Sequence, residues 1–250
     1  MDLAQNFQDL FSVASLISML TLTVLEIVLG IDNIIFIAII ASKLPQRADQ
    51  RKARVAGLSL ALLFRIALLF SITWVIGLKD PLFYISDFGA TGRDLILFAG
   101  GVFLLYKTTI EIHNKIEGGE EQGVNVKKVA LGAIVMQIVF IDIVFSFDSI
   151  LTAVGLVTNV LVMVMAVIIA MLIMLAFSEK VSDFINKHPT IKMLALAFLL
   201  MIGMILILDA CHFHVPKQYI YVSMAFSLLV EGLNMRMRSQ RAKKGIHKDN

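Results

Sequence analysis

Long apolar segments follow one another along most of this 250-residue chain, and they constrain its fold more than any other feature. A helix needs about 20 predominantly apolar residues to cross the hydrocarbon core of a bilayer. Hydrophobic residues make up 58% of the chain and charged residues only 16%, which is too apolar for a soluble domain. We therefore predict an all-α polytopic membrane protein with seven transmembrane helices, at about 12–40, 55–78, 94–112, 129–157, 159–177, 193–210 and 218–234.

The positions of the prolines agree with helical spans. Pro45, Pro81, Pro189 and Pro216 all fall between the apolar segments. Proline lacks a backbone donor, and in a bilayer that loss is harmless only where the chain has left the helix. The segments therefore read as uninterrupted by proline, and the lipid bilayer is the first partner that the sequence implies.

The distribution of basic residues predicts the orientation. Of the 22 Lys and Arg residues, 18 lie in the connections 41–54, 107–128 and 178–192 or after residue 234. Because cytoplasmic loops carry the excess of Lys and Arg, we expect the N-terminus outside and the C-terminus in the cytoplasm. The pI near 9.0 then reflects topology and contact with anionic lipid headgroups, so no nucleic acid partner is required. One basic residue, Arg65, lies inside an apolar segment.

Two octets of matching pattern place acids inside the apolar sequence. They are Glu26–Asn33 (EIVLGIDN) and Asp142–Ser149 (DIVFSFDS). Each has an acid first, a small residue fifth, Asp seventh and an oxygen-bearing Asn or Ser eighth. Because a charged side chain in the bilayer core is costly, an intramembrane acid indicates a functional site. Four acids in matched positions strengthen that interpretation over a structural network, for which neutral Asn or Ser would suffice.

The predicted topology makes the two octets antiparallel. The first segment runs from outside to inside and the fourth from inside to outside, so we predict two inverted three-helix repeats, at about 12–112 and 129–210. A seventh helix at about 218–234 and a basic cytoplasmic tail at 235–250 complete a single domain over 1–250. Inverted repeats around a midplane site are typical of secondary transporters.

The chemistry of the octets indicates a hard cation. On a straight helix the first and seventh positions point apart, so we expect Gly30 and Ser146 to loosen or kink their helices and turn the second acid inward. The candidate metal ligands are oxygen donors without thiolate or imidazole, which suits Mn, Mg or Ca as a transported ion and disfavours Zn or Cu. No prosthetic group is implied. The proposed ligands are Glu26, Asp32, Asn33, Asp142, Asp148 and Ser149.

The charge of this set predicts how the site is emptied. Four carboxylates exceed the charge of one divalent ion, so an empty site should hold protons, and exchange of a cation for protons follows. Alternatively, Arg65 supplies the counter-charge, or it only pairs structurally.

Together with the octets, the stretches His188–Leu196 (HPTIKMLAL), Tyr219–Ser227 (YIYVSMAFS) and Val230–Asn234 (VEGLN) resemble the TerC family of bacterial integral membrane proteins. The similarity covers nearly the whole chain and is greatest to short members that consist of the membrane domain. It implies a seven-helix inner-membrane transporter related to the lysine-exporter superfamily. Some members are linked to manganese export and the founding members to tellurite resistance, so Mn(II) becomes the first choice of ion. The family's motif residues carry over to the six ligands named above.

Other classes of function remain as alternatives. Two aspartates sharing a proton could form an intramembrane hydrolase, but the YD and GxGD motifs typical of such enzymes are absent, and we predict no enzyme. A membrane scaffold for metal delivery or stress resistance is the other alternative, although only 117–126 looks like a flexible docking loop. Two minor sites are a cytoplasmic gate at Glu231 and Asn234, and a metal-release site at Asp209, Cys211, His212 and His214.

Overall fold

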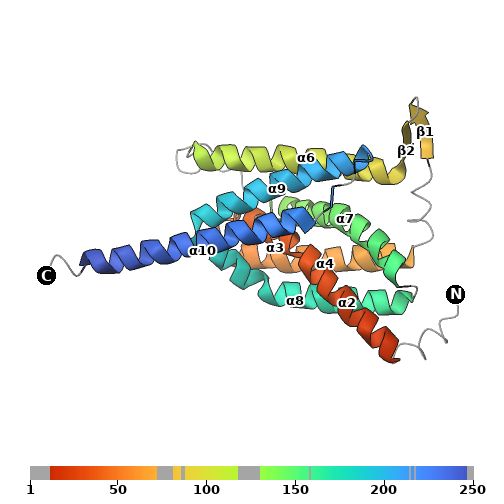
Figure 1. Ribbon diagram of the computed structural model, residues 1–250, viewed down its shortest axis with the longest axis horizontal. Coiled ribbons are helices and arrows are strands. Elements are labelled where there is room, and N and C mark those ends of the chain that lie inside the picture. Colours follow the sequence, from red (N-terminus) through yellow and green to blue (C-terminus); the bar gives the residue numbers. More distant parts are fainter. Residues whose placement is uncertain are drawn as a thin grey trace.

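The chain is nearly all helical in a computed structural model that describes residues 12–71, 81–85, 88–117, 130–157, 159–213, 215–216 and 218–246 (Figure 1). Each predicted segment overlaps one helix, or the bent pair that forms the first segment. This confirms the all-α membrane class. The helices are α2 (Val13–Leu29), α3 (Ile31–Ala41), α4 (Arg47–Phe70), α6 (Gly92–Ile116), α7 (Leu131–Leu156), α8 (Val160–Lys187), α9 (Pro189–Ala210) and α10 (Gln218–Ile246).

The helices differ in their capacity to cross a membrane. By length and apolar composition, four of the described helices qualify alone, namely α4, α6, α8 and α9, and the pair α2–α3 adds a fifth if it is one broken span. In α7 the described residues include an apolar stretch at Leu131–Phe147. α10 joins an apolar first half to a basic second half, and it extends past the bundle (Figure 1). Seven crossings therefore stay a prediction.

The first predicted segment is broken at Gly30, as the sequence predicts. α2 ends at Leu29 and α3 begins at Ile31, and the two helices are bent by 41°. Gly30 has a right-handed backbone (φ −85°) that other residues could also adopt. What matters at this position is therefore the absence of a side chain. A Cβ on Gly30 would lie 2.3 Å from Sδ of Met174 on α8. The break therefore sits at a point where α8 approaches closely.

The second octet remains inside a continuous helix, which differs from the symmetrical kink that we expected. Ser146 Oγ donates to the backbone carbonyls of Asp142 and Ile143. Serine that bonds back to the preceding turn often bends a helix without breaking it. Figure 1 shows α7 curving along its length, and the intrahelical ladder continues through Ser146.

The three most extensive helix contacts join the two halves of the chain. α2 packs on α8, α4 packs on α7, and α6 packs on α9. The α6–α9 contact is closest at two glycines, where a Cβ on Gly101 would lie 2.7 Å from the carbonyl oxygen of Gly203. Small residues at crossing points let transmembrane helices approach backbone to backbone. The interior thus lies between the two halves, and this is also where the octets meet.

A short hairpin lies in the connection before α6 and was not predicted. β1 (Pro81–Ile85) pairs antiparallel with β2 (Phe88–Thr91). Pro81 is the first residue of its strand, a position where proline costs no ladder hydrogen bond. Thr91 then caps α6, because its side chain accepts from the amide of Asp94 while the Asp94 carboxylate accepts from the amide of Thr91. The reciprocal bonds fix the start of α6.

Candidate functional site

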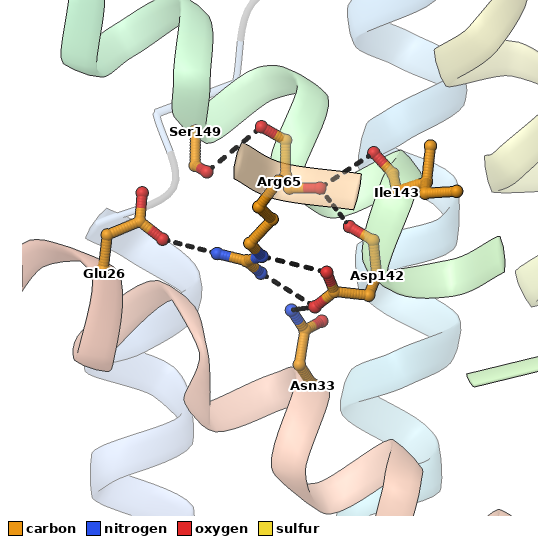
Figure 2. A network of polar contacts seen from close by, with 7 residues as sticks. Glu26, Asn33, Arg65, Asp142, Ile143 and Ser149 are labelled. Carbon is orange, nitrogen blue, oxygen red and sulfur yellow. Dashed lines mark hydrogen bonds and ion pairs between the residues drawn. The ribbon is translucent and has the colours of Figure 1, made fainter. Parts of the chain in front are cut away.

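Arg65 of α4 lies at the centre of a buried polar network that joins both octets (Figure 2). Its Nη1 donates to Glu26 Oε2 at 2.6 Å. Its Nε and Nη2 donate to the two carboxylate oxygens of Asp142, at 2.9 and 2.8 Å. The three residues are 3%, 2% and 1% exposed for Arg65, Glu26 and Asp142. Helices α2, α4 and α7 therefore meet at one guanidinium group.

Asn33 adds α3 to the same network. Its Nδ2 donates to Asp142 Oδ1 at 3.2 Å, and the residue is 3% exposed. The bend at Gly30 is what directs α3 away from the axis of α2. Among the described residues, Asn33 Oδ1 is buried with no hydrogen-bond partner. A buried acceptor without a donor is energetically costly, and an amide oxygen is a ligand that hard cations use.

The network carries a net negative charge when its groups are ionised. Glu26 and Asp142 contribute two negative charges, and Arg65 offsets one of them. The planar fork of arginine suits a two-oxygen contact with a carboxylate. Arg65 is thus paired with both carboxylates, and its role as counter-charge to the site stays a prediction. Removal of one partner from such a buried set is costly, because a charge is left uncompensated.

Ser149 lies beside this network in Figure 2, and Asp32 lines a small cavity together with it. Both line a cavity of about 40 Å³, together with Leu29 and Phe145 and with residues of α9 and α10 (Ile202, Ile205, Leu206, Ile220 and Tyr221). Asp32 is 6% exposed, and Ser149 Oγ donates to the carbonyl of Ser146 at 3.2 Å. α3 is already helical at Asp32, and successive residues on a helix point about 100° apart. Asp32 therefore lines the cavity while Asn33 bonds Asp142.

The six predicted ligands thus divide into two groups in the structure. Glu26, Asn33 and Asp142 meet at Arg65, and Asp32 and Ser149 share the small cavity. Asp148 is part of α7, but its side chain lies outside the described residues. Within the described part of the chain, no three His, Cys, Asp or Glu side chains are grouped to hold a metal. Asp32 lines the small cavity with Ser149, and its turn toward Glu26 stays a prediction.

Two of the predicted metal-release residues contact charged side chains at the start of α6. His212 Nε2 lies 2.9 Å from Asp94 Oδ2 on α6, and Asp209 Oδ2 lies 3.8 Å from an Arg93 nitrogen. Cys211 is an exposed free thiol, and His214 lies outside the described residues. These contacts tie the end of α9 to the start of α6.

The predicted cytoplasmic gate residues do share a helix face. Asn234 Nδ2 lies 3.5 Å from Glu231 Oε2, and Thr190 Oγ1 on α9 donates to Glu231 Oε1 at 2.5 Å. Glu231 and Thr190 line a wide groove of about 540 Å³ between α9 and α10. The contact docks α10 onto the start of α9.

One buried acid is not singled out by the sequence pattern. Glu111 on α6 is 5% exposed and forms an ion pair with Lys43, which follows α3. From spacing alone, Lys107 four residues earlier is the natural partner. The Lys107 ammonium instead lies 5.9 Å from the centre of the Phe103 ring. In the sequence, the burial of Glu111 is indicated only by the apolar residues on the same face of its helix.

Comparison with known proteins places the chain in a family. Residues 11–245 match the model of the integral membrane protein TerC family. The chain is 48% identical over 221 residues to the UPF0053 inner membrane protein YoaE of Escherichia coli K12, which covers 88% of this chain and 42% of YoaE. It is 48% identical over 217 residues to the UPF0053 inner membrane protein YgdQ of the same strain, covering 86% of this chain and 90% of YgdQ.

A third relative agrees with the second in length. A UPF0053 protein of Haemophilus influenzae is 47% identical over 223 residues, which cover 89% of this chain and 94% of that protein. The chain thus spans less than half of YoaE and nearly all of the other two relatives. No solved structure matches the chain. With its acid octets, helical bundle and match over residues 11–245, the chain belongs to the TerC family of integral membrane proteins.

Proposed function

We propose that this chain is a membrane transporter that exports a divalent metal cation, first of all Mn(II), from the cytoplasm, in exchange for protons. One observation carries the proposal: two carboxylates from the two octets converge, almost wholly buried, on one cationic group. A structural crosslink between helices needs no charge, and burial of charge in a membrane is costly. The arrangement is that of a site built to compensate a cation.

The pairing of the helices supports alternating access. If the two predicted triplets are exchanged, the contact of α2 with α8 becomes that of α7 with α4, and the contact of α6 with α9 maps onto itself. All these contacts occur in the chain, as a two-fold relation between inverted repeats requires. Rocking of one triplet against the other would open the interface to each side in turn.

In this proposal, the ion's ligands come from both groups of octet residues. Glu26 and Asp142 contribute carboxylates, and Asn33 contributes its amide oxygen. Asp32 and Ser149, at the adjoining cavity of about 40 Å³, contribute oxygens on the path of the ion toward α9 and α10. Oxygen donors favour Mn, Mg or Ca, and carboxylates left without the ion would take up protons.

Transport is preferred here over the two other classes of function. In a hydrolytic aspartate pair, one carboxylate shares its proton with another, whereas Asp142 directs both oxygens to Arg65 and Asn33. A scaffold for metal delivery or tellurite resistance would act through its connections. The candidate docking loop, 117–126, lies almost wholly outside the described residues.

The test is the manganese content of cells under Mn load. Cells express the parental chain, Asp142→Asn, Asp32→Asn or Asp148→Asn at equal membrane abundance, and intracellular Mn is measured by elemental analysis. Glu179→Gln serves as the control, because this α8 acid has a side chain that is 59% exposed. We expect lower Mn with the parental chain and the control than with the three octet variants.

The opposite pattern would reject the proposal. Equal Mn in parental and octet-variant cells would exclude Mn efflux through this site, and repetition with Ca and Mg would show whether another hard cation is carried. Elution of each purified variant as a single species in detergent distinguishes lost transport from lost folding.

A further inference from the structure

We infer that Arg65 is a tethered substitute cation: it occupies the carboxylates when no ion is bound, and it must leave them before a divalent ion can bind. This inference rests on the proposed function, because it takes Glu26 and Asp142 as ligands of the ion. It adds a specificity-determining residue that does not itself contact the metal.

Arg65 occupies the carboxylate oxygens that a metal ion would use as ligands. Arg65 directs three donor nitrogens to Glu26 and Asp142, and it uses both oxygens of Asp142. A metal ligated by these same oxygens would need the lone pairs that the guanidinium now occupies. Arg65 and a metal therefore cannot hold the two carboxylates in the same way at the same time. The two cations compete for one position.

Beside the guanidinium lies an amide oxygen that no donor uses among the described residues. Asn33 already donates to Asp142, yet its Oδ1 is buried without a partner among the described residues. The guanidinium of Arg65 could donate a hydrogen bond to this oxygen. Its three hydrogen bonds within this network go to the two carboxylates instead. The amide oxygen is therefore a ligand that the guanidinium leaves over and that a hard cation would use. The site thus offers a metal one oxygen that its present occupant does not use.

Arg65 and a divalent cation differ in how much of the carboxylate charge they neutralise. With Arg65 in place, the two carboxylates keep one net negative charge, and with a divalent cation in its place they keep none. A monovalent ion that displaced Arg65 would only restore the same charge and would give up three hydrogen bonds. In a buried site, where charge compensation is decisive, displacement of Arg65 thus favours a divalent ion over Na⁺ or K⁺.

The same feature explains how an empty site could be stable. Two buried carboxylates without a cation would have to take up protons or draw in water. Arg65 removes most of this need, because it neutralises one charge and satisfies three acceptor positions. Return of the guanidinium would then help to expel the ion on the far side. Fewer protons need to be exchanged per ion than the four acids alone would suggest.

The test measures Mn²⁺ binding to the purified full chain in detergent by titration calorimetry at fixed pH. We compare the parental chain with Arg65→Gln and Arg65→Lys. The matched control is Arg54→Gln, because Arg54 is also on α4 and is 5% exposed, but its Nη1 reaches Ser182 Oγ of α8 at 3.5 Å. We expect Arg65→Gln to bind Mn²⁺ about tenfold or more tightly, since no internal cation competes, and Arg54→Gln to bind like the parent.

Arg65→Lys keeps the test decisive if Arg65→Gln does not fold. An ammonium group lacks the planar fork, so it should hold the two carboxylates less well, and Mn²⁺ should bind more tightly than to the parent. In Arg65→Ala, added methylguanidinium at a concentration that does not denature should weaken Mn²⁺ binding, and it should have no such effect on the parent. A purely structural arginine would not produce this competition.

The outcomes separate the inference from the proposed function. If cells export Mn but the Arg65 variants bind it no more tightly than the parent, the inference is overturned and the proposed function stands. If the parent does not export Mn while Arg65→Gln binds it more tightly, the inference is supported and export is rejected. If no variant binds Mn²⁺, both are overturned.

Discussion

Replacement of Gly30 by alanine tests whether the broken helix depends on close contact with α8. A Cβ at Gly30 would lie 2.3 Å from Met174 Sδ and 2.9 Å from the carbonyl oxygen of Glu26. Nonbonded heavy atoms are normally about 3.5–4.0 Å apart, so Met174 must retreat by more than about 1 Å. Met174 is 1% exposed, so it must move against neighbouring buried atoms. Overpacking of this kind costs about 1–3 kcal/mol, or a fall of roughly 2–12 °C in Tm for a chain of this size.

The assay is thermal unfolding of the purified protein in detergent. Gly232→Ala is the control, because this glycine lies within α10 and a Cβ there meets nothing within 4 Å. Alanine is the better helix former, so the control should be unchanged or more stable by up to about 1 kcal/mol. The double variant Gly30→Ala with Met174→Ala should lose less stability than the sum of the two single changes. Equal melting of Gly30→Ala and Gly232→Ala would refute the reasoning.

Three further changes give distinct expected results in the same melting assay. Gly101→Ala should destabilise more than Gly30→Ala, because its Cβ would meet the Gly203 backbone, which cannot rotate away; an equal or smaller loss would contradict the close approach of α6 and α9. Glu26→Gln should cost less than Arg65→Gln, since the first leaves a neutral Arg65–Asp142 pair and the second leaves two buried carboxylates; the reverse order would refute the charge argument. Thr91→Ala should cost about 0.5–2 kcal/mol through loss of the α6 cap, and an unchanged Tm would contradict it.

Much of the fold could be predicted because apolar length and proline position act locally. The start of α7 at Leu131 and the end of α9 at Ala210 lie within a few residues of the predicted limits. The break at Gly30 could also be predicted, because a glycine between two acids on opposite faces indicates a change of direction. The hairpin at 81–91 could not, since its strands are short and carry no regular alternation.

The sequence predicts the meeting of the two octets but not how their side chains are arranged. Repetition of the octets identified Glu26 and Asp142 as partners, and both lie in one network. The separation of Asp32 from that network depends on the rotation of α3 after the break, which no periodicity encodes. The role of Arg65 depends on how α4 lies between α2 and α7, which is a property of tertiary packing. Sequence spacing likewise could not predict the ion pair of Glu111 with Lys43, because the two residues are far apart in the sequence and meet only through tertiary packing.

The order in which the charged residues are synthesised has a consequence for assembly in the membrane. Glu26 and Arg65 are made well before Asp142, so the first helices reach the bilayer when only these two charges of the network exist. An arginine or a carboxylate alone would resist insertion, and the Glu26–Arg65 pair offsets one charge of each sign before α7 is made. α7 would then bring Asp142 to an arginine that is already paired with Glu26. The network would thus be completed in two steps during biogenesis.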